Sequence, residues 1–213
     1  MSTRAERTRV DLGLIRSWIK PQARVLDLGC GPGTLLADLA THKGCTVQGV
    51  EMDLASQVKA MARGVPVIGV DIDKQLDLFA DASYDVVIMS RTLQAVRYPG
   101  VVLRHMMRIA PIAVVSMPNF GYWRNRLRLL GGHAPVSKDL PYQWHDSPNV
   151  HFGSSRDLED LFDQIGLSIL KCVALGADGH ISRAPIRSRN WSAGAVVYEL
   201  ADQRQPLPSA GRR

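Results

Sequence analysis

The segment that most constrains the fold of this chain is Val25-Leu26-Asp27-Leu28-Gly29-Cys30-Gly31-Pro32-Gly33. It joins an apolar strand to a glycine-rich loop, and a helix-like pattern follows from Thr34. An acidic residue, Glu51, ends the next apolar run 22 positions after Gly29. This order is typical of a pocket for an adenosine-containing cofactor at the carboxyl ends of parallel strands. The alternative is a tight strand-to-helix turn that binds nothing.

Charge indicates which cofactor such a pocket would take. A dinucleotide fingerprint reads G-x-G-x-x-G, whereas the glycines here stand at 29, 31 and 33 and Thr34 follows. Asp27 ends the strand, where its carboxylate would repel a pyrophosphate and attract an ammonium or a sulfonium. Glu51 can accept hydrogen bonds from both ribose hydroxyls. These residues predict S-adenosylmethionine (SAM) or S-adenosylhomocysteine, whose carboxylate we expect the N–H groups of the glycine loop, with Cys30 among them, to hold.

Residues after the other strands complete the predicted site. Met52 either lies on the adenine face or packs as an ordinary apolar side chain. Asp71, followed by Ile72, either accepts a hydrogen bond from the adenine amine or caps the short helix that follows, and the two interpretations stand equal. The backbone at Ser90 should pass under the methionine end of the cofactor. The cation of Arg91 would be unfavourable near a sulfonium, so we expect it to point outward.

Composition predicts one globular α/β domain. The chain has 213 residues with 46% hydrophobic and 22% charged residues, so we expect a single domain over residues 1–203 and a disordered tail over 204–213. The net charge of +6 is scattered rather than massed, which argues against a nucleic-acid partner. No apolar run approaches the ~20 residues of a membrane span, and no signal peptide begins the sequence. We therefore expect a cytoplasmic protein without a membrane partner.

The three cysteines, Cys30, Cys45 and Cys172, are too few and too irregularly spaced for a disulfide framework or a zinc site. Cys30 lies in the glycine loop before a helix, where the pKa of a thiol can fall. The alternative, which we favour, is a small residue that fits a tight loop, because no base is paired with it.

Short apolar runs alternate with helical patterns, which favours a parallel sheet covered on both faces. The expected strands are 25–28, 47–50, 67–70, 84–90, 113–117, 168–175 and 195–200, and the expected helices are 11–19, 34–41, 54–63, 100–109, 122–130 and 156–165. Ser154 and Asp157 predict a capping box for the last helix, and Gly166 its end. The last two strands are joined by a polar loop without a helix, so they should pair antiparallel. The prediction is a Rossmann-like, seven-stranded, mostly parallel sheet with an antiparallel C-terminal strand pair.

The stretch 131–153 is long, irregular and rich in polar and aromatic residues, and it leaves the carboxyl end of the fifth strand. Loops of this length in a compact domain are usually functional or mobile. Its candidates for a catalytic base are Tyr142, His145, Asp146 and His151. Their spacing does not demand a metal, and the alternative is a loop held by buried polar contacts.

Several segments give the chain a specific resemblance to the MetW family of methionine biosynthesis proteins. They are Leu140-Pro141-Tyr142-Gln143-Trp144-His145-Asp146-Ser147-Pro148-Asn149-Val150-His151-Phe152, Thr92-Leu93-Gln94-Ala95-Val96-Arg97, Pro118-Asn119-Phe120-Gly121-Tyr122-Trp123 and Pro135-Val136-Ser137-Lys138. With the glycine loop, the likeness runs from about residue 11 to about residue 175. Pro32 departs from the family, which is expected to carry an acidic residue there.

The resemblance implies a class I SAM-dependent methyltransferase fold and a role beside homoserine O-acyltransferase. Fold alone does not establish an activity. Two hypotheses therefore stand: a SAM-binding partner or regulator of the acyltransferase, and an active methyltransferase acting on a small molecule. A partner surface would leave the aromatic residues of the stretch 131–153 exposed, whereas an enzyme lid would fold them over the pocket.

Overall fold

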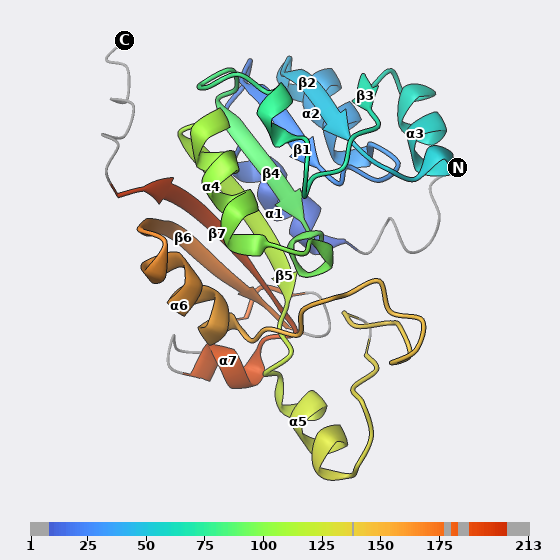
Figure 1. The fold of residues 1–213 in the computed structure, drawn as a ribbon, viewed down its shortest axis with the longest axis vertical. Coiled ribbons are helices and arrows are strands. Elements are labelled where there is room, and N and C mark those ends of the chain that lie inside the picture. The colour runs from blue at the N-terminus through green and yellow to red at the C-terminus, as the bar shows by residue number, and fades with distance from the viewer. Residues whose placement is uncertain (1–8, 138, 177–179, 183–187, 204–213) are drawn as a thin grey trace.

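A computed structural model describes residues 9–137, 139–176, 180–182 and 188–203 (Figure 1). Within these ranges, seven strands form one sheet in the order β3-β2-β1-β4-β5-β7-β6. The strands are β1 (Arg24–Leu28), β2 (Thr46–Val50), β3 (Val67–Ile68), β4 (Val86–Ser90), β5 (Ile112–Pro118), β6 (Leu167–Leu175) and β7 (Ala195–Asp202). The predicted tail, residues 204–213, lies outside the described residues.

The sheet changes direction where the sequence predicts it. Strands β1 to β5 pair in parallel, and β7 pairs antiparallel with both β5 and β6. The first strand lies at the centre of the parallel part, between β2 and β4, so the loop after Leu28 lies where the strand order reverses. Ligands of open α/β sheets bind at such a switch point. The predicted fold class is confirmed.

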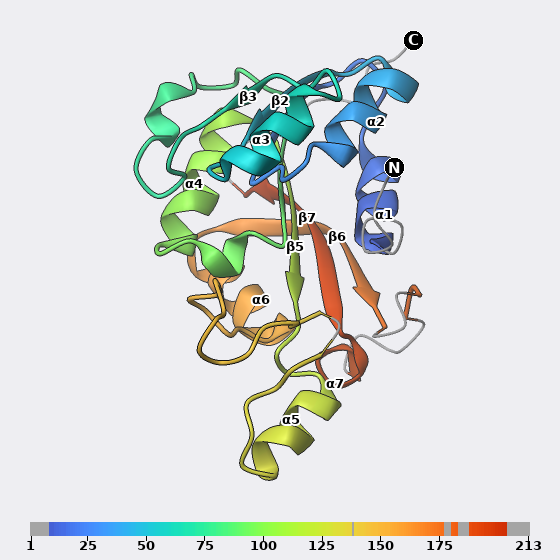
Figure 2. The ribbon, with the colours of Figure 1, turned by 90° about the vertical axis from the view of Figure 1, so that its right-hand side faces the viewer.

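Helices cover both faces of the sheet (Figure 2). Helices α1 (Val10–Trp18), α2 (Thr34–Lys43) and α3 (Leu54–Met61) pack on one face, and α4 (Pro99–Ile109) and α6 (Ser155–Gln164) on the other. Two short 3-10 helices, η2 (Leu76–Leu78) and η3 (Leu93–Ala95), follow β3 and β4. The predicted capping box of Ser154 and Asp157 starts α6, and Gly166, with a φ of 77°, follows its end.

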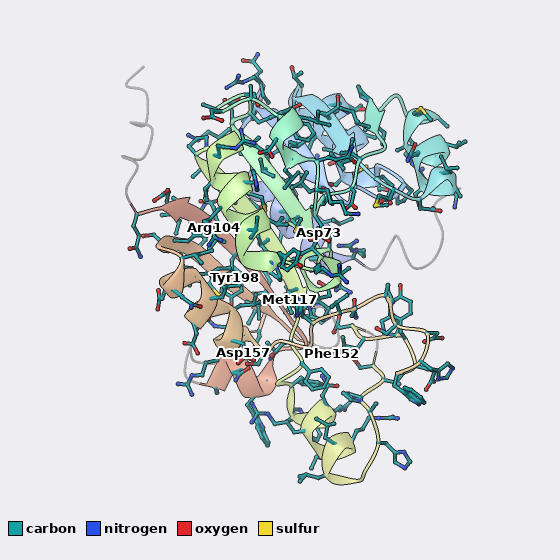
Figure 3. The ribbon with its side chains drawn as sticks, in the orientation of Figure 1. Asp73, Arg104, Met117, Phe152, Asp157 and Tyr198 are labelled. Carbon is teal, nitrogen blue, oxygen red and sulfur yellow. The ribbon has the colours of Figure 1, made fainter. Side chains whose placement is uncertain are left out.

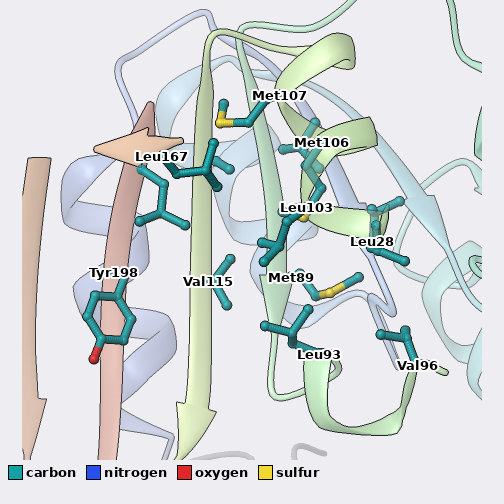
Figure 4. Packing of buried hydrophobic residues seen from close by; sticks show 14 of the residues in the cluster. Leu28, Met89, Leu93, Val96, Leu103, Met106, Met107, Val115, Leu167 and Tyr198 are labelled. Atoms are coloured by element: carbon teal, nitrogen blue, oxygen red, sulfur yellow. The ribbon is translucent and has the colours of Figure 1, made fainter. Parts of the chain in front are cut away.

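Each face has its own hydrophobic core. Helix α4 buries Val102, Leu103, Met106 and Met107, a spacing that places them on one side of a helix, against Val115 of β5 (Figure 4). On the opposite face, Ile15 of α1 packs with apolar residues of α2 and of the parallel strands. The two cores fix the carboxyl ends of β1, β2 and β4 relative to one another, and the candidate site lies there.

Several expected boundaries differ from the structure, and hydrogen bonding explains two of them. Strand β3 ends at Ile68 because its partner β2 ends opposite it, at Val50, and leaves no neighbour for residues 69–70. Strand β4 starts at Val86 because its pairings with β1 and β5 both begin there. The connection between β6 and β7 also contains a short helix, α7 (Arg189–Ser192), where we expected none.

Helix α5 (Trp123–Leu130) and the described residues 131–137 and 139–153 project from the body of the molecule beyond the carboxyl end of β5 (Figures 1 and 2). The helix contributes one buried residue, Asn125, whereas Leu127 and Leu130 are exposed. We call residues 123–137 and 139–153 the projecting segment.

Candidate cofactor site

A pocket of about 110 Å³ lies at the carboxyl ends of β1 and β4, beside the first turn of α2. Its lining is Arg9, Leu12, Asp27, Gly29, Cys30, Gly31, Pro32, Thr34, Leu35 and Ser90. Five of the predicted site residues therefore meet in one place, and the N-terminal segment before α1 forms a wall that the sequence did not predict.

The glycine loop adopts a backbone that side chains disfavour. Gly29, Gly31 and Gly33 have φ values of 82°, 54° and 70°. A Cβ atom at Gly33 would lie 2.8 Å from the Cβ of Ala60, so this glycine also lets α2 and α3 approach. A Cβ atom at Gly31 would meet no atom within 4 Å. The loop therefore packs against α3 at Gly33 and is open toward the pocket at Gly31.

The N–H groups of this loop are not free to hold a ligand carboxylate, contrary to our expectation. Those of Gly29 and Cys30 both donate to the carbonyl of Val50, at 2.8 and 2.9 Å. That of Gly33 donates to the carbonyl of Cys30. The N–H of Gly31 donates to a side chain, Glu51 Oε2, at 2.8 Å.

Glu51 follows β2 and lies next to the glycine loop. Besides Gly31, it accepts a hydrogen bond from the N–H of Asp53 on Oε1 at 2.9 Å. Both oxygens therefore hold backbone groups, yet each carboxylate oxygen has a second lone pair. The side chain is fixed against the glycine loop, with acceptor capacity left for a pair of hydroxyls.

Asp27 carries the most distinctive chemistry of the pocket. Its side chain is 4% exposed, and its Oδ1 has no hydrogen-bond partner among the described residues. The hydroxyl of Thr34, on the same wall, likewise has none there. Burial raises the pKa of Asp27 to about 7, with Glu51 adding to the rise and Arg9 opposing it. An orphaned buried acceptor fits a ligand that brings a cation, as an ammonium does.

The thiol of Cys30 fits the interpretation that we favoured. Burial raises its pKa to about 12, and the charges of Asp27 and Glu51 contribute to the rise. A Cβ atom at Gly49 would lie 2.5 Å from its Sγ, so the side chain fills a gap beside β2. The raised pKa and this contact agree with Cys30 as a small residue that fits the tight loop.

A buried ion-pair network supports the wall opposite the glycine loop. Asp11, 1% exposed, binds Arg9 Nη2 at 2.6 Å and Arg91 Nε at 3.2 Å. Burial raises the pKa of Asp11, but the hydrogen bond and charge of Arg9 and the charge of Arg91 together lower it further than burial raises it. Ser90 Oγ accepts from Arg9 Nη2 at 2.6 Å, and Arg91 Nη2 reaches Asp139 of the projecting segment at 2.9 Å.

Sequence reasoning missed Arg9 and Asp11, and it expected Arg91 to point outward. Arg91 stays outside the lining of the pocket, yet its side chain is only 25% exposed because two carboxylates hold it. One signal was present in the sequence. Asp11 stands four residues before Ile15, on the core-facing side of α1, where a carboxylate requires a buried partner.

Five of the predicted cofactor residues lie outside the pocket lining: Gly33, Glu51, Met52, Asp71 and Ile72. Met52 is 65% exposed, and Ile72 packs against the core on the α4 face. The carboxylate of Asp71 accepts from the N–H of Asp73 at 3.0 Å and pairs with Lys74 at 2.8 Å. These contacts form a local turn, and the helix η2 that follows has Gln75 at its N-cap, so Asp71 does not cap that helix.

The candidates for a catalytic base do not gather at the pocket. Tyr142 is 45% exposed, and His145 and Asp146 are also exposed in the projecting segment. His151 Nε2 lies 3.3 Å from the carbonyl of Arg97. Among the described residues, no group of three His, Cys, Asp or Glu side chains could hold a metal ion, and no helix is long and apolar enough to cross a membrane.

Comparison with known families agrees with this geometry. The sequence profile of the family described as "Methionine biosynthesis protein MetW" matches residues 9–200. This chain belongs to the MetW family. The match begins at Arg9, so it includes the N-terminal wall of the pocket as well as the glycine loop and the projecting segment.

A curated relative adds a second finding for this MetW chain. The "bifunctional methionine biosynthesis protein MetXA/MetW" of Rhodopirellula baltica is 33% identical over 198 residues, which cover 88% of this chain and 32% of the relative. The chain thus spans about a third of the length of that protein. The relative's name describes a MetW portion joined to a MetXA portion in one polypeptide.

Solved structures share the fold at low sequence identity. A SAM-dependent methyltransferase from Thermotoga maritima has a TM-score of 0.68 at 20% identity, covering 92% of this chain and 90% of that one. A magnesium protoporphyrin IX methyltransferase from Synechocystis, solved with bound S-adenosylhomocysteine, has a TM-score of 0.65 at 16% identity (95% and 89%). A [4+2]-cyclase has a TM-score of 0.66 at 18% identity (95% and 84%). These likenesses establish the fold and no activity.

Proposed function

We propose that this chain binds SAM and acts with a homoserine O-acyltransferase, as its partner or regulator, in the acylation step of methionine synthesis. The observation that carries the SAM part is the buried, unpartnered Asp27 carboxylate in a pocket beside Glu51 and a glycine loop that is open at Gly31. Asp27 would meet the cationic end of SAM and Glu51 its ribose. When bound, SAM supplies an electrophilic methyl group.

The partner part of the proposal rests on the family and on the fused relative. A polypeptide that joins MetXA and MetW portions keeps the two at high effective concentration, which favours an association between them. Genes that fuse in one organism often encode separate chains that bind each other in another. The fusion therefore supports an acyltransferase as the partner of this chain.

The exposed aromatic residues of the projecting segment favour a surface that binds a partner over a lid that encloses a substrate. Trp144 is 78% exposed, and Tyr142 and Phe152 are 45% and 53% exposed. None of the three lines the Asp27 pocket. Together they border an apolar hollow of about 180 Å³ with Leu129 and Phe120. Exposed aromatic side chains around a small hollow are typical of interface anchors.

A second hollow, of about 410 Å³, adjoins the loop after β4 and could accept a small molecule, which favours the methyltransferase hypothesis. Met117, Phe152 and Asp157 lie around it (Figure 3). Its ionisable residues are already engaged, since Asp157 forms the capping box of α6 and His151 contacts the carbonyl of Arg97. Among its described lining residues there is no free general base. We therefore favour the SAM-binding partner over the active methyltransferase.

Mixing this chain with a purified homoserine O-acyltransferase tests the proposal. Size-exclusion chromatography and the rate of homoserine acylation are measured with each protein alone and with both, in the presence and absence of SAM. We expect a complex and a changed acylation rate, with SAM shifting one or both. Absence of a complex together with an unchanged rate would contradict the partner role.

A further inference from the structure

Helix α5 is hardly covered by the rest of the described chain. Of its eight residues, six are exposed and Asn125 alone is buried. It lies at one end of the molecule in both ribbon views (Figures 1 and 2). An isolated helix shorter than ~12 residues is marginal in water, so a helix this short and this exposed depends on contacts at its base.

The first turn of α5 is tied to the end of β5 and to α7. Asn125 Nδ2 donates to the carbonyl of Asn119 at 3.2 Å, and Arg126 Nε donates to the carbonyl of Gly121 at 2.6 Å. The guanidinium of Arg126 also lies over the ring of Trp191, 5.3 Å from its centre. These contacts hold the helix in a fixed orientation in which it presents its second turn to the surroundings. Binding through that turn therefore pays little for ordering it.

The exposed face of α5 carries an apolar stripe. Trp123, Leu127 and Leu130 stand four and three positions apart, a spacing that places them on one side of a helix. Leu127 is 53% exposed and Leu130 is 84% exposed. Leu129 lies on another side of the helix and lines the hollow that Trp144 borders, so the stripe is separate from that hollow. Apolar residues at this spacing are typical of a helix that enters a groove of another protein.

The charge of α5 is all of one sign. Arg124, Arg126 and Arg128 lie on it, and residues 119–138 contain no Asp or Glu. The described contacts of these arginines are with backbone carbonyls and aromatic rings and not with carboxylates. By helical spacing, Arg124 and Arg126 flank the apolar stripe on its two sides. The complement of such a face is an apolar groove that is bordered by carboxylates.

Two other occupants fit this face less well. A second copy of this chain, related by a two-fold axis, would bring the arginines of one α5 against those of the other. An anionic lipid surface suits the charge, but an interfacial helix binds in proportion to its buried apolar area, and this stripe has three apolar side chains. A protein with an acidic rim around an apolar groove satisfies both the stripe and the arginines.

We propose that α5 docks this chain on the acyltransferase by entering an apolar groove that Asp or Glu side chains border. Trp123, Leu127 and Leu130 fill the groove, and Arg124 and Arg126 meet the carboxylates. This inference rests on the proposed function and deepens it, because it names the docking helix and the chemistry of the surface that receives it.

Calorimetric titration of a purified homoserine O-acyltransferase with the full chain and two variants tests the proposal. Leu130→Ser removes the most exposed apolar residue of the stripe, and Arg124→Glu reverses a flanking charge. Each should weaken association roughly tenfold or more, while circular dichroism and the binding of S-adenosylhomocysteine stay as in the wild type. Added salt should weaken wild-type association, and it should weaken that of Arg124→Glu less.

Two matched controls separate a local contact from a general effect. Leu78→Ser makes the same apolar-to-polar change at a residue of η2 that is 69% exposed. Arg104→Glu makes the same change in net charge at an exposed residue of α4, distant from α5 (Figure 3). Both controls should associate like the wild type. An equal loss in Arg104→Glu and Arg124→Glu would show an effect of net charge and overturn the carboxylate border.

The other occupants are outcomes of two further measurements on the chain alone. Size-exclusion chromatography should show a monomer, and sedimentation with phosphatidylcholine vesicles containing phosphatidylserine should leave the chain in solution. A dimer that Leu130→Ser dissociates would assign the stripe to a second copy and overturn the inference. Vesicle binding that Arg124→Glu abolishes, with acyltransferase association unchanged, would overturn it in favour of a membrane surface.

The failure of this inference is distinct from that of the proposed function. If the wild type binds the acyltransferase and both α5 variants bind it equally well, the docking surface lies elsewhere and the partner role stands. If the wild type itself forms no complex and leaves the acylation rate unchanged, both are overturned.

Discussion

Glu51 Oε2 accepts a hydrogen bond from the backbone N–H of Gly31 at 2.8 Å. This contact joins the acidic residue after β2 to the glycine loop after β1, so the predicted ribose acceptor and the predicted cofactor loop form one unit. Oε1 meanwhile holds the N–H of Asp53. The side chain is therefore held in a fixed position, from which it would meet a ligand.

Glu51→Ala should weaken the binding of SAM by roughly 1.5–3 kcal/mol, the cost of losing hydrogen bonds to a charged group. Glu51→Gln should weaken it less, because one acceptor oxygen remains. Calorimetry with S-adenosylhomocysteine measures both. Equal affinities of wild type and Glu51→Ala would show that the ribose is held elsewhere.

Ligand binding should strengthen as the pH rises through about 7. Burial, with a smaller contribution from Glu51 and against the effect of Arg9, raises the pKa of Asp27 to about 7, so the free protein holds a proton there below that pH. An ammonium binds best to the ionised carboxylate, so affinity for S-adenosylhomocysteine should rise by up to about tenfold between pH 6 and pH 8. Asp27→Asn should bind weakly and without this dependence. A wild-type affinity that is flat over this range would contradict the assigned role of Asp27.

A rise in pH should lower the stability of the ligand-free protein through Asp27, whereas it should strengthen ligand binding. An unfolded Asp27 loses its proton near pH 3.8, and the folded one near 7, so the folded state binds more protons between these values. The free energy of unfolding of the ligand-free protein should therefore fall as pH rises from about 4 to about 7, by roughly 4 kcal/mol at most. Urea denaturation of wild type and Asp27→Asn, compared at pH 5 and pH 8, measures the difference. The Asn variant should gain stability relative to wild type at pH 8, and an unchanged difference would contradict the burial of an unpartnered carboxylate.

The variant Trp144→Ala should show whether Trp144 is an interface anchor or a core residue. The side chain is 78% exposed and contacts the ring of His145, so the variant should melt and bind SAM like the wild type. Association with the acyltransferase should weaken by about 2 kcal/mol or more. Leu54→Ala, an equally exposed apolar residue on α3 (74%), is the control and should leave association unchanged. A Trp144→Ala variant that is destabilised by roughly 3–5 kcal/mol and still binds the acyltransferase would show that the segment is structural packing.

Asn119 should contribute strongly to stability. Its Nδ2 donates to the carbonyls of Asn190 and Ala193, and its Oδ1 accepts from the N–H groups of Gly121 and Ser155. It thereby links the end of β5 to the starts of α6 and β7. Asn119→Ala should destabilise the fold by at least about 2 kcal/mol in urea denaturation, because buried backbone groups lose their partners. Asn119→Asp keeps the acceptor but turns a carboxylate oxygen toward the carbonyls of Asn190 and Ala193, so it should cost at least as much as Asn119→Ala at pH 7, and a smaller loss would contradict this assignment of roles.

Sequence reasoning succeeded where local pattern decides structure. The strand-loop-helix unit around Gly29, the capping box at Ser154 and the reversal of strand direction before β7 depend on residues near one another in the chain. The pocket wall at Arg9 depends instead on where α1 packs, which brings Asp11 beside Ser90 and Ser116, about 80 and 105 positions away. The N–H groups of Gly29 and Cys30 were misjudged because their acceptor, the carbonyl of Val50, belongs to the neighbouring strand.

Titration of the purified chain with S-adenosylhomocysteine in a calorimeter tests the central claim most directly. We predict saturable heat with about one site per chain, an affinity measurable at micromolar protein, and no heat with NAD under the same conditions. Absence of heat with both SAM and S-adenosylhomocysteine, at protein concentrations suited to micromolar affinity and with the fold verified by circular dichroism, would contradict the account.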